Sequence, residues 1–252
     1  MDKKDYERFQ DLRFEDFKKM AQDERLSCYE KIGFPNAYRQ GKEEYIFADI
    51  ISKLKNLNLK NKVVIDIGPG CSELAFMLIE LCRIQGHTLI LIDSAEMLAH
   101  LPDEPFIRKV PHYYPQSCQP FIEEYTGKVD VILTYSVLHY VFVEANIFEF
   151  LDKSLGLLAS NGEMLIGDVP NISKRKRFFS SLSGILYHQE FTGTKEIPVV
   201  KYNDIEHEKI DDAVILGLVQ RCRNSGFDAY ILPQAANLPM ANRREDILIV
   251  KP

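Results

Sequence analysis

The sequence lacks an excess of basic residues, a long apolar run and a recognisable export signal. Its 31 Lys and Arg against 37 Asp and Glu give a formal net charge of -6, which disfavours general attraction to nucleic acid or anionic membranes. The longest apolar stretch, around residues 131–142, is too short to cross a bilayer, and the N-terminus is charged from its second residue. We therefore expect a cytoplasmic protein with a small-molecule substrate, no nucleic-acid partner and no membrane contact.

Paired cysteines are also missing. The five cysteines are scattered, with no C-x-x-C pair and no histidine at ligand spacing. This pattern indicates free thiols in a reducing compartment and predicts no metal site. The sequence shows no internal repeat, and 252 residues fit one α/β domain with an additional segment.

Hydrophobic periodicity separates the chain at about residue 60. Before it, Phe14, Phe17 and Met20 share one helical face, and residues 45–54 indicate a second amphipathic helix. After it, apolar runs alternate with helical periodicity, which is typical of a doubly wound, mostly parallel sheet covered on both faces. Seven strands are predicted, at residues 63–67, 89–92, 106–110, 129–133, 162–166, 229–232 and 247–250.

The last two predicted strands are joined by a loop too short for a helical crossover, so the final strand should be reversed. The predicted domains are an N-terminal helical lid at 1–60 and a Rossmann-like α/β domain at 61–252. The strand rhythm breaks over roughly forty residues, about 170–210, a length more typical of a functional insertion than of a plain connection. We interpret this insertion as a lid or substrate cap.

A strand that runs into a glycine turn and then a helix is the strongest functional signal. Gly68 and Gly70 let the backbone pass close beneath a ligand, and the helix after them offers free N–H groups to a carboxylate or phosphate. Asp66 precedes the first glycine, and Asp93 ends the next strand, where a carboxylate can accept both hydroxyls of a ribose. The pattern predicts an adenosine-containing cofactor. The alternative is a glycine-rich turn with incidental acids.

Two classes of cofactor use this arrangement. A dinucleotide would bring a pyrophosphate to the helix start, where Asp66 would repel it and where a small residue is expected instead of Glu73. An NAD-dependent oxidoreductase is therefore the less favoured alternative.

These residues resemble the first motif of the class I S-adenosylmethionine-dependent methyltransferases. Asp66, Gly68 and Gly70 match that motif, Ser72 replaces its last glycine, and Asp93 matches the second-strand acid. The resemblance implies S-adenosylmethionine as cofactor and S-adenosylhomocysteine as product, with Asp66 near the ammonium and Asp93 on the ribose. It also places Met97 by the adenine. The predicted cofactor site comprises Asp66, Gly68, Gly70, Ser72, Asp93, Ser94, Met97, Tyr135 and Arg39.

The segment after the third strand departs from that family. Many members carry an acid there for the adenine amine, whereas this chain has Tyr113 and Tyr114. Either tyrosine could stack on the adenine base, or it could have a purely structural packing role instead.

Arg39 lies in a polar segment between two predicted helices and could pair with the methionyl carboxylate. A plain helix connection is the alternative. The phrase Tyr29-Glu-Lys-Ile-Gly-Phe-Pro35 also resembles bacterial methyltransferases of surface-polysaccharide pathways.

His139, after the fourth strand, is the first candidate for a general base, because a hydroxyl acceptor loses a proton as the methyl group moves. Its alternative role is to begin the next helix and bond the backbone. Asp168, at the end of the fifth strand, is the second candidate, and His188 and His207 in the insertion are weaker ones.

Two basic loops, 171–177 and 242–244, should open at the carboxyl edge of the sheet. Lys174, Arg175 and Arg243 in them predict an anionic acceptor such as a phosphorylated or nucleotide-linked sugar. A solvated charged surface is the alternative.

The favoured function is O- or N-methylation of a small, anionic acceptor. A non-catalytic adenosyl-binding scaffold remains as an alternative, because fold does not determine function. The N/D-P-P-Y/F motif of base-amino methyltransferases is absent after the fourth strand, where the chain reads Thr134-Tyr-Ser-Val137.

Overall fold

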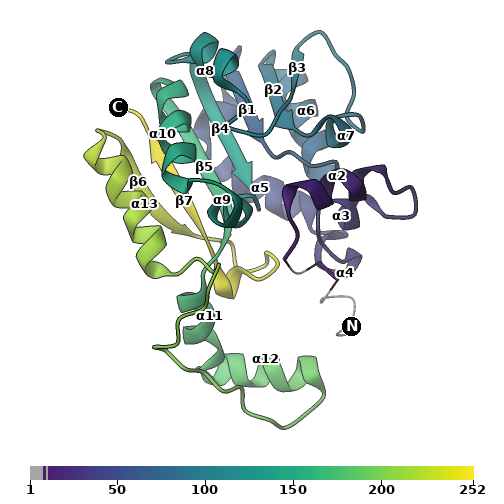
Figure 1. Ribbon diagram of the computed structural model, residues 1–252, viewed down its shortest axis with the longest axis vertical. Helices are drawn as coiled ribbons and strands as arrows, with labels where there is room; N and C mark the ends of the chain where they lie inside the picture. The colour runs from purple at the N-terminus through teal and green to yellow at the C-terminus, as the bar shows by residue number, and fades with distance from the viewer. Residues whose placement is uncertain (1–7, 10) are drawn as a thin grey trace.

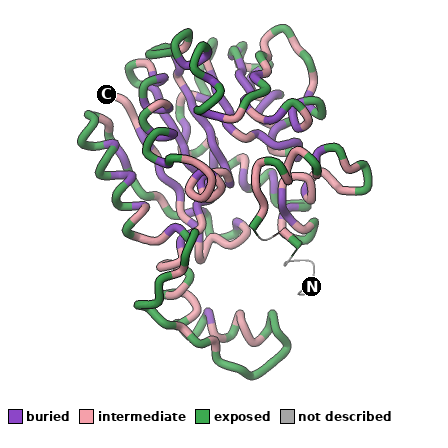
Figure 2. Tube along the Cα trace, viewed as in Figure 1, coloured by how far each residue is buried: buried purple, intermediate pink, exposed green. Residues whose placement is uncertain are grey.

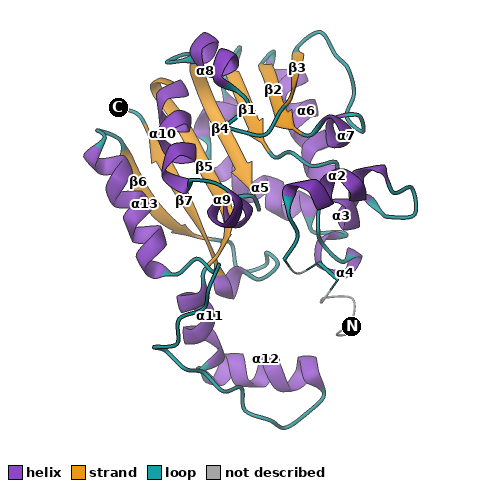
Figure 3. Cartoon of the chain, in the orientation of Figure 1, coloured by secondary structure: helices purple, strands orange, loops and turns teal. Residues whose placement is uncertain are grey.

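A seven-stranded sheet organises the chain. The computed structural model describes residues 8, 9 and 11–252, and its strands lie in the order β3-β2-β1-β4-β5-β7-β6 (Figures 1 and 3). Only β7 runs antiparallel to its neighbours β5 and β6, so the predicted fold class and reversed last strand are confirmed. The strands are β1 (Val63–Ile67), β2 (Thr88–Asp93), β3 (Ile107–Pro111), β4 (Val129–Tyr135), β5 (Leu158–Pro170), β6 (Asp228–Pro233) and β7 (Arg244–Val250).

Helices cover both faces of the sheet, because alternate strand residues enter two separate apolar clusters. On β1, Ile65 packs with one cluster and Val64 with the other. The first cluster contains residues of α8 (Gln119–Tyr125), α9 (Leu138–Glu144), α10 (Ile147–Leu157) and α13 (Asp212–Asn224). The second contains residues of α5 (Glu43–Lys53), η1 (Lys55–Asn58), α6 (Glu73–Gln85) and α7 (Ala95–Leu98).

The first sixty residues divide between the sheet and its carboxyl edge. Helix α5 supplies Ile46 and Ile50 to the apolar core against the sheet. Helices α2 (Phe14–Gln22), α3 (Cys28–Lys31) and α4 (Asn36–Arg39) lie beyond the carboxyl ends of the strands (Figure 1). Only α2 to α4 are therefore placed where a lid could act, whereas α5 packs as part of the α/β domain.

The insertion after β5 folds as two helices, α11 (Ile172–Phe179) and α12 (Leu182–Thr192). Our expectation of a loop at 171–177 is wrong, because the Asn171 side chain caps α11 by accepting from the N–H groups of Ser173 and Lys174. Helix α12 extends from the sheet and buries only Gly184 (Figure 2). Over the described residues, no helix combines the length and apolar character needed to span a bilayer.

Candidate functional site

The turn between β1 and α6 depends on its two glycines. Gly68 and Gly70 adopt φ values of 75° and 64°, in the left-handed region that favours glycine. A Cβ atom on Gly68 would lie 2.5 Å from Val137 Cγ2, and one on Gly70 would lie 2.6 Å from Ile32 Cγ2. Both positions therefore require the absence of a side chain.

Asp93 joins this turn to the end of β2. Its carboxylate accepts hydrogen bonds from the N–H of Gly70 at 3.3 Å and of Ser94 at 2.7 Å. Burial raises the pKa of Asp93 to about 6, although these two N–H donors oppose the shift. The carboxylate is thus fixed in orientation and ionised at neutral pH.

A cavity opens over this turn, here called the turn cavity. Seven of the nine predicted cofactor residues line it: Arg39, Gly68, Gly70, Ser72, Asp93, Met97 and Tyr135. Residues from β1, β2, β4 and the N-terminal helices thus converge on one space, as ligand sites do at the carboxyl edge of such sheets.

Asp66 and Ser94 are the two predicted cofactor residues outside that lining. Asp66 lies buried on β1, where burial, followed by the neighbouring Asp93 carboxyl, raises its pKa to about 8. Ser94 caps α7, and its hydroxyl accepts from the Met97 N–H at 3.1 Å. Neither side chain therefore lines the turn cavity.

The side of the turn cavity formed by α2 is apolar. Phe14 and Phe17 of α2 line it with Tyr113 and Tyr140. Phe14 lies 4.7 Å from Tyr113, and Phe17 lies 4.9 Å from Tyr140, between ring centroids. The periodicity of residues 14–22 predicts that one face of α2 is buried. It does not show that this face covers a cavity.

The predicted N–H groups at the start of α6 are not all free. Glu43 of α5 accepts from the Leu74 N–H at 3.0 Å and from the Ser72 hydroxyl at 3.3 Å. Burial raises the pKa of Glu43, which Arg39 at 3.7 Å partly opposes. The protein's own carboxylate therefore occupies part of the position that we predicted for a ligand.

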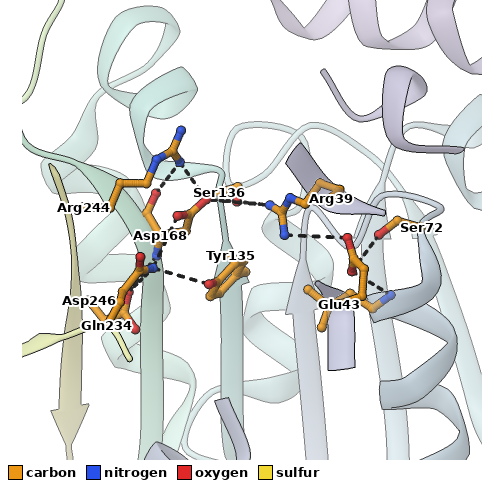
Figure 4. A network of polar contacts seen from close by, with 10 residues as sticks. Arg39, Glu43, Ser72, Tyr135, Ser136, Asp168, Gln234, Arg244 and Asp246 are labelled. Atoms are coloured by element: carbon orange, nitrogen blue, oxygen red, sulfur yellow. Dashed lines mark hydrogen bonds and ion pairs between the residues drawn. The ribbon is translucent and has the colours of Figure 1, made fainter. Parts of the chain in front are cut away.

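Arg39 connects the N-terminal helices to the sheet through a buried polar network (Figure 4). Its guanidinium donates to Ser136 Oγ at 2.6 Å, and Ser136 donates to Asp168 Oδ2 at 2.5 Å. Its second nitrogen faces Glu43. The charge of Arg39 is therefore already balanced by carboxylates on both sides.

Asp168 is the centre of this network. Arg244 donates to its Oδ2 at 2.6 Å, and Gln234 donates to its Oδ1 at 3.3 Å. Gln234 also reaches Asp246 at 3.1 Å. Because donors occupy both carboxylate oxygens, Asp168 is arranged to position Arg39 and Arg244. Its use as a general base stays a prediction, and no motif in the sequence singled out Ser136 or Gln234.

A second cavity, of about 360 Å³, lies between the N-terminal segment, α9, α11 and the short helix η2 (Ala241–Arg243). We call it the outer cavity. His139, Arg175 and Arg243 line it, whereas His188 and His207 line neither cavity. Tyr140 lines both cavities and so forms a shared wall.

Lys174 does not line the outer cavity. It donates to the Arg244 carbonyl oxygen at 2.7 Å, and burial lowers its pKa. The structure therefore separates Lys174 from the other two residues of the predicted substrate site.

His139 lies at the start of α9 with its ring centroid 3.9 Å from that of Tyr140. Burial lowers its pKa to about 3, with smaller contributions from the Arg244 and Lys209 charges. Within the described part of the chain, its buried Nδ1 has no hydrogen-bond partner. The imidazole is thus neutral at physiological pH, and its Nδ1 is unpaired among the described residues.

Comparison with known proteins shows which solved structures share this fold. No family model matches the sequence, and no curated protein matches it. Among solved structures, the plantazolicin methyltransferase BamL, in complex with a triazolic desmethylPZN analog and SAH, is similar at a TM-score of 0.57 and 13% identity, over 94% of this chain and 97% of that one. The related BpumL complex gives 0.55 and 14%, over 98% and 99%.

The CurJ carbon methyltransferase is similar at a TM-score of 0.53 and 16% identity, over 85% of this chain. This chain spans only 56% of that structure's length. At these identities the comparisons establish a shared fold, and the chain has the fold of these methyltransferases.

Proposed function

We propose that this protein is a methyltransferase that uses S-adenosylmethionine to methylate a small acceptor on oxygen or nitrogen. The observation that carries the proposal is the turn cavity, where a glycine turn that excludes side chains meets an oriented Asp93 carboxylate. The shared fold with methyltransferases supports it. When bound, S-adenosylmethionine would supply an activated methyl group for in-line displacement by the acceptor.

The residues of the turn cavity fit this cofactor. Asp93 offers a carboxylate for two ribose hydroxyls, and the apolar Met97 with Tyr113 offers a surface for an adenine ring. Asp93 adds negative charge near a ligand that carries a sulfonium and an ammonium group, whereas Asp66, with a pKa of about 8, is mostly protonated at neutral pH. Arg39, despite its present ion pairs, lines the same space and remains the predicted partner of the methionyl carboxylate.

On the acceptor side, we assign the outer cavity as the entrance, with Tyr140 between acceptor and cofactor. In the tautomer that leaves its Nδ1 unprotonated, His139 would accept a hydrogen bond or the proton from the methyl acceptor. Because a pKa of about 3 makes His139 a weak base, alignment in a water-poor site would contribute more to the rate than proton transfer. Asp168 acts as a positioning residue through Arg39 and Arg244.

Two glycine substitutions provide a matched test. Gly68→Ala and Gly127→Ala both place a side chain at positive φ, but only the first meets a neighbour, since nothing lies within 4 Å of a Cβ on Gly127. The strain common to both is about 1–2 kcal/mol. We expect calorimetric titration to show unchanged S-adenosylhomocysteine affinity in Gly127→Ala and a loss of at least about tenfold in Gly68→Ala, where the added methyl group overpacks against Val137. Equal affinity in two folded variants, verified by thermal unfolding, would contradict the proposal.

A further inference from the structure

The charged residues around the outer cavity are unevenly paired. Among the described residues, three acidic ones line it, and each lies within 4.0 Å of a basic side chain. The pairs are Glu208 with Arg13 at 3.2 Å, Glu206 with Lys176 at 3.2 Å, and Asp11 with Lys209 at 3.9 Å. Arg244, on the same wall, is paired with Asp168 at 2.6 Å.

Arg175 and Arg243 are the exceptions. Across residues 8, 9 and 11–252, neither guanidinium has a carboxylate within 4.0 Å, and the one side-chain acceptor recorded for Arg243 is the Asn242 amide oxygen at 3.1 Å. Both contact the ring of Phe179 instead, Arg175 at 5.5 Å and Arg243 at 6.0 Å from its centroid. Arg243 also lies 5.5 Å from the centroid of Tyr187.

This arrangement holds two cations near one aromatic ring. A ring face attracts a guanidinium without using its N–H donors, which stay available for an anion. Because both guanidinium groups lie within 6.0 Å of the same ring centroid, their positive charges repel each other, and a bound anion would reduce that cost. Phe179 of α11 and Tyr187 of α12 therefore fix the guanidinium groups on the cavity wall while leaving their charge uncompensated.

We infer that Arg175 and Arg243, held by the rings of Phe179 and Tyr187, form an anion clamp for a phosphoryl group on the acceptor. The inference rests on the proposed function, since it names the acceptor class of the same site. A phosphate monoester carries a charge of about -1.5 to -2 near pH 7, which matches two guanidinium groups, whereas a carboxylate carries one negative charge. Arginine also matches phosphate oxygens through paired N–H donors.

The clamp gives the insertion a function. Arg175 and Phe179 belong to α11, and Tyr187 belongs to α12. Arg243 comes from η2, next to β7. Residues far apart in the sequence thus meet at one wall, and the two inserted helices act as a specificity element of the outer cavity.

The test uses inorganic phosphate as the probe, followed by ³¹P NMR line broadening at constant ionic strength. We expect the unmodified protein to bind phosphate, and Arg175→Gln/Arg243→Gln to weaken binding by at least about tenfold. Arg177→Gln is the matched control, because Arg177 lies on the same helix but pairs with Asp212 at 2.5 Å and does not line the cavity. Equal phosphate binding by all three proteins, or none by the unmodified protein, would overturn the clamp.

Two further comparisons distinguish binding at the clamp from nonspecific electrostatic attraction of anions. Phe179→Leu should weaken phosphate binding by about two- to fivefold, and Phe179→Tyr, which keeps a ring face, should restore it. Unchanged binding in Phe179→Leu would refute the positioning role. Acetate should displace phosphate only at much higher concentration, and displacement at equal concentration would refute the preference for a phosphoryl group.

Titration of the same variants with S-adenosylhomocysteine distinguishes failure of the clamp from failure of the proposed function. Both arginines lie outside the turn cavity, so we expect unchanged nucleoside affinity in the double variant. If the unmodified protein binds S-adenosylhomocysteine but not phosphate, only the clamp proposal is rejected. Phosphate binding without nucleoside binding would reject the methyltransferase proposal and leave an anion site.

Discussion

The buried carboxyl of Asp66 makes stability depend on pH in a definite direction. Its folded-state pKa of about 8 lies above the ordinary value of 3.8 because of burial and the Asp93 neighbour. Between these two values the folded state binds more protons than the unfolded state, so stability falls as pH rises toward 8. We expect the free energy of unfolding to be larger near pH 6 than near pH 8.5.

Asp66→Asn should remove most of this dependence and be more stable than the unmodified protein near pH 8.5. Urea unfolding at both pH values measures the effect. Asp93, whose pKa is about 6, contributes to the pH dependence of stability mainly below pH 6. The variant Asp93→Asn should therefore keep the fall in stability between pH 6 and 8.5, and it serves as an internal comparison. If the free energy of unfolding still falls between pH 6 and 8.5 in Asp66→Asn, the fall does not come from Asp66. Asp66 would then already be ionised at pH 6, which contradicts the prediction.

His139 should remain neutral over the physiological range. Its pKa of about 3 reflects burial and the nearby Arg244 and Lys209 charges. NMR titration of the imidazole protons should therefore show no transition for His139 between about pH 5 and 8, whereas an ordinary histidine titrates near 6.5. A midpoint near 6.5 would contradict the assigned burial and restore His139 as an efficient general base.

Helix α2 covers the turn cavity through Phe14 and Phe17. If these rings close over the cofactor, Phe17→Ala should weaken S-adenosylhomocysteine binding by about tenfold or more, since a buried Phe side chain contributes about 1.5–3 kcal/mol. Phe76→Ala on α6 is the control, because Phe76 is 45% exposed and lines neither cavity. Calorimetry checks both variants, and equal affinities would show that α2 does not cover the ligand.

Other elements differ in how far the sequence predicts them. The strands are predictable because short apolar runs bounded by turns have few alternative structures in a chain of this pattern. The sequence does not predict α8, because its seven residues show too little periodicity. It does not predict α11, because the run of basic residues leaves few apolar positions there and none is buried. Asn171 was its usable N-cap signal.

Over the whole molecule, the sequence predicts the sheet and most of the turn cavity because short local sequence patterns reveal both. The glycine turn and Asp93 belong to consecutive strand ends, which a parallel sheet brings to one edge. Contacts made by side chains from distant segments were beyond prediction. Glu43 binding the start of α6 and Arg39 reaching Ser136 depend on how α4 and α5 pack, which periodicity does not specify.

The central claim is that the turn cavity binds an adenosyl cofactor rather than a dinucleotide. Calorimetric titration of the unmodified protein and of Asp93→Ala with S-adenosylmethionine, S-adenosylhomocysteine and NADH tests it directly. Asp103→Ala is the control, since the Asp103 side chain is 91% exposed. We expect both adenosyl compounds to bind the unmodified protein. Their affinity should fall at least about tenfold in Asp93→Ala, which loses charge-assisted hydrogen bonds, and should be unchanged in the control. Binding of NADH alone, or of none of the three compounds, would contradict it.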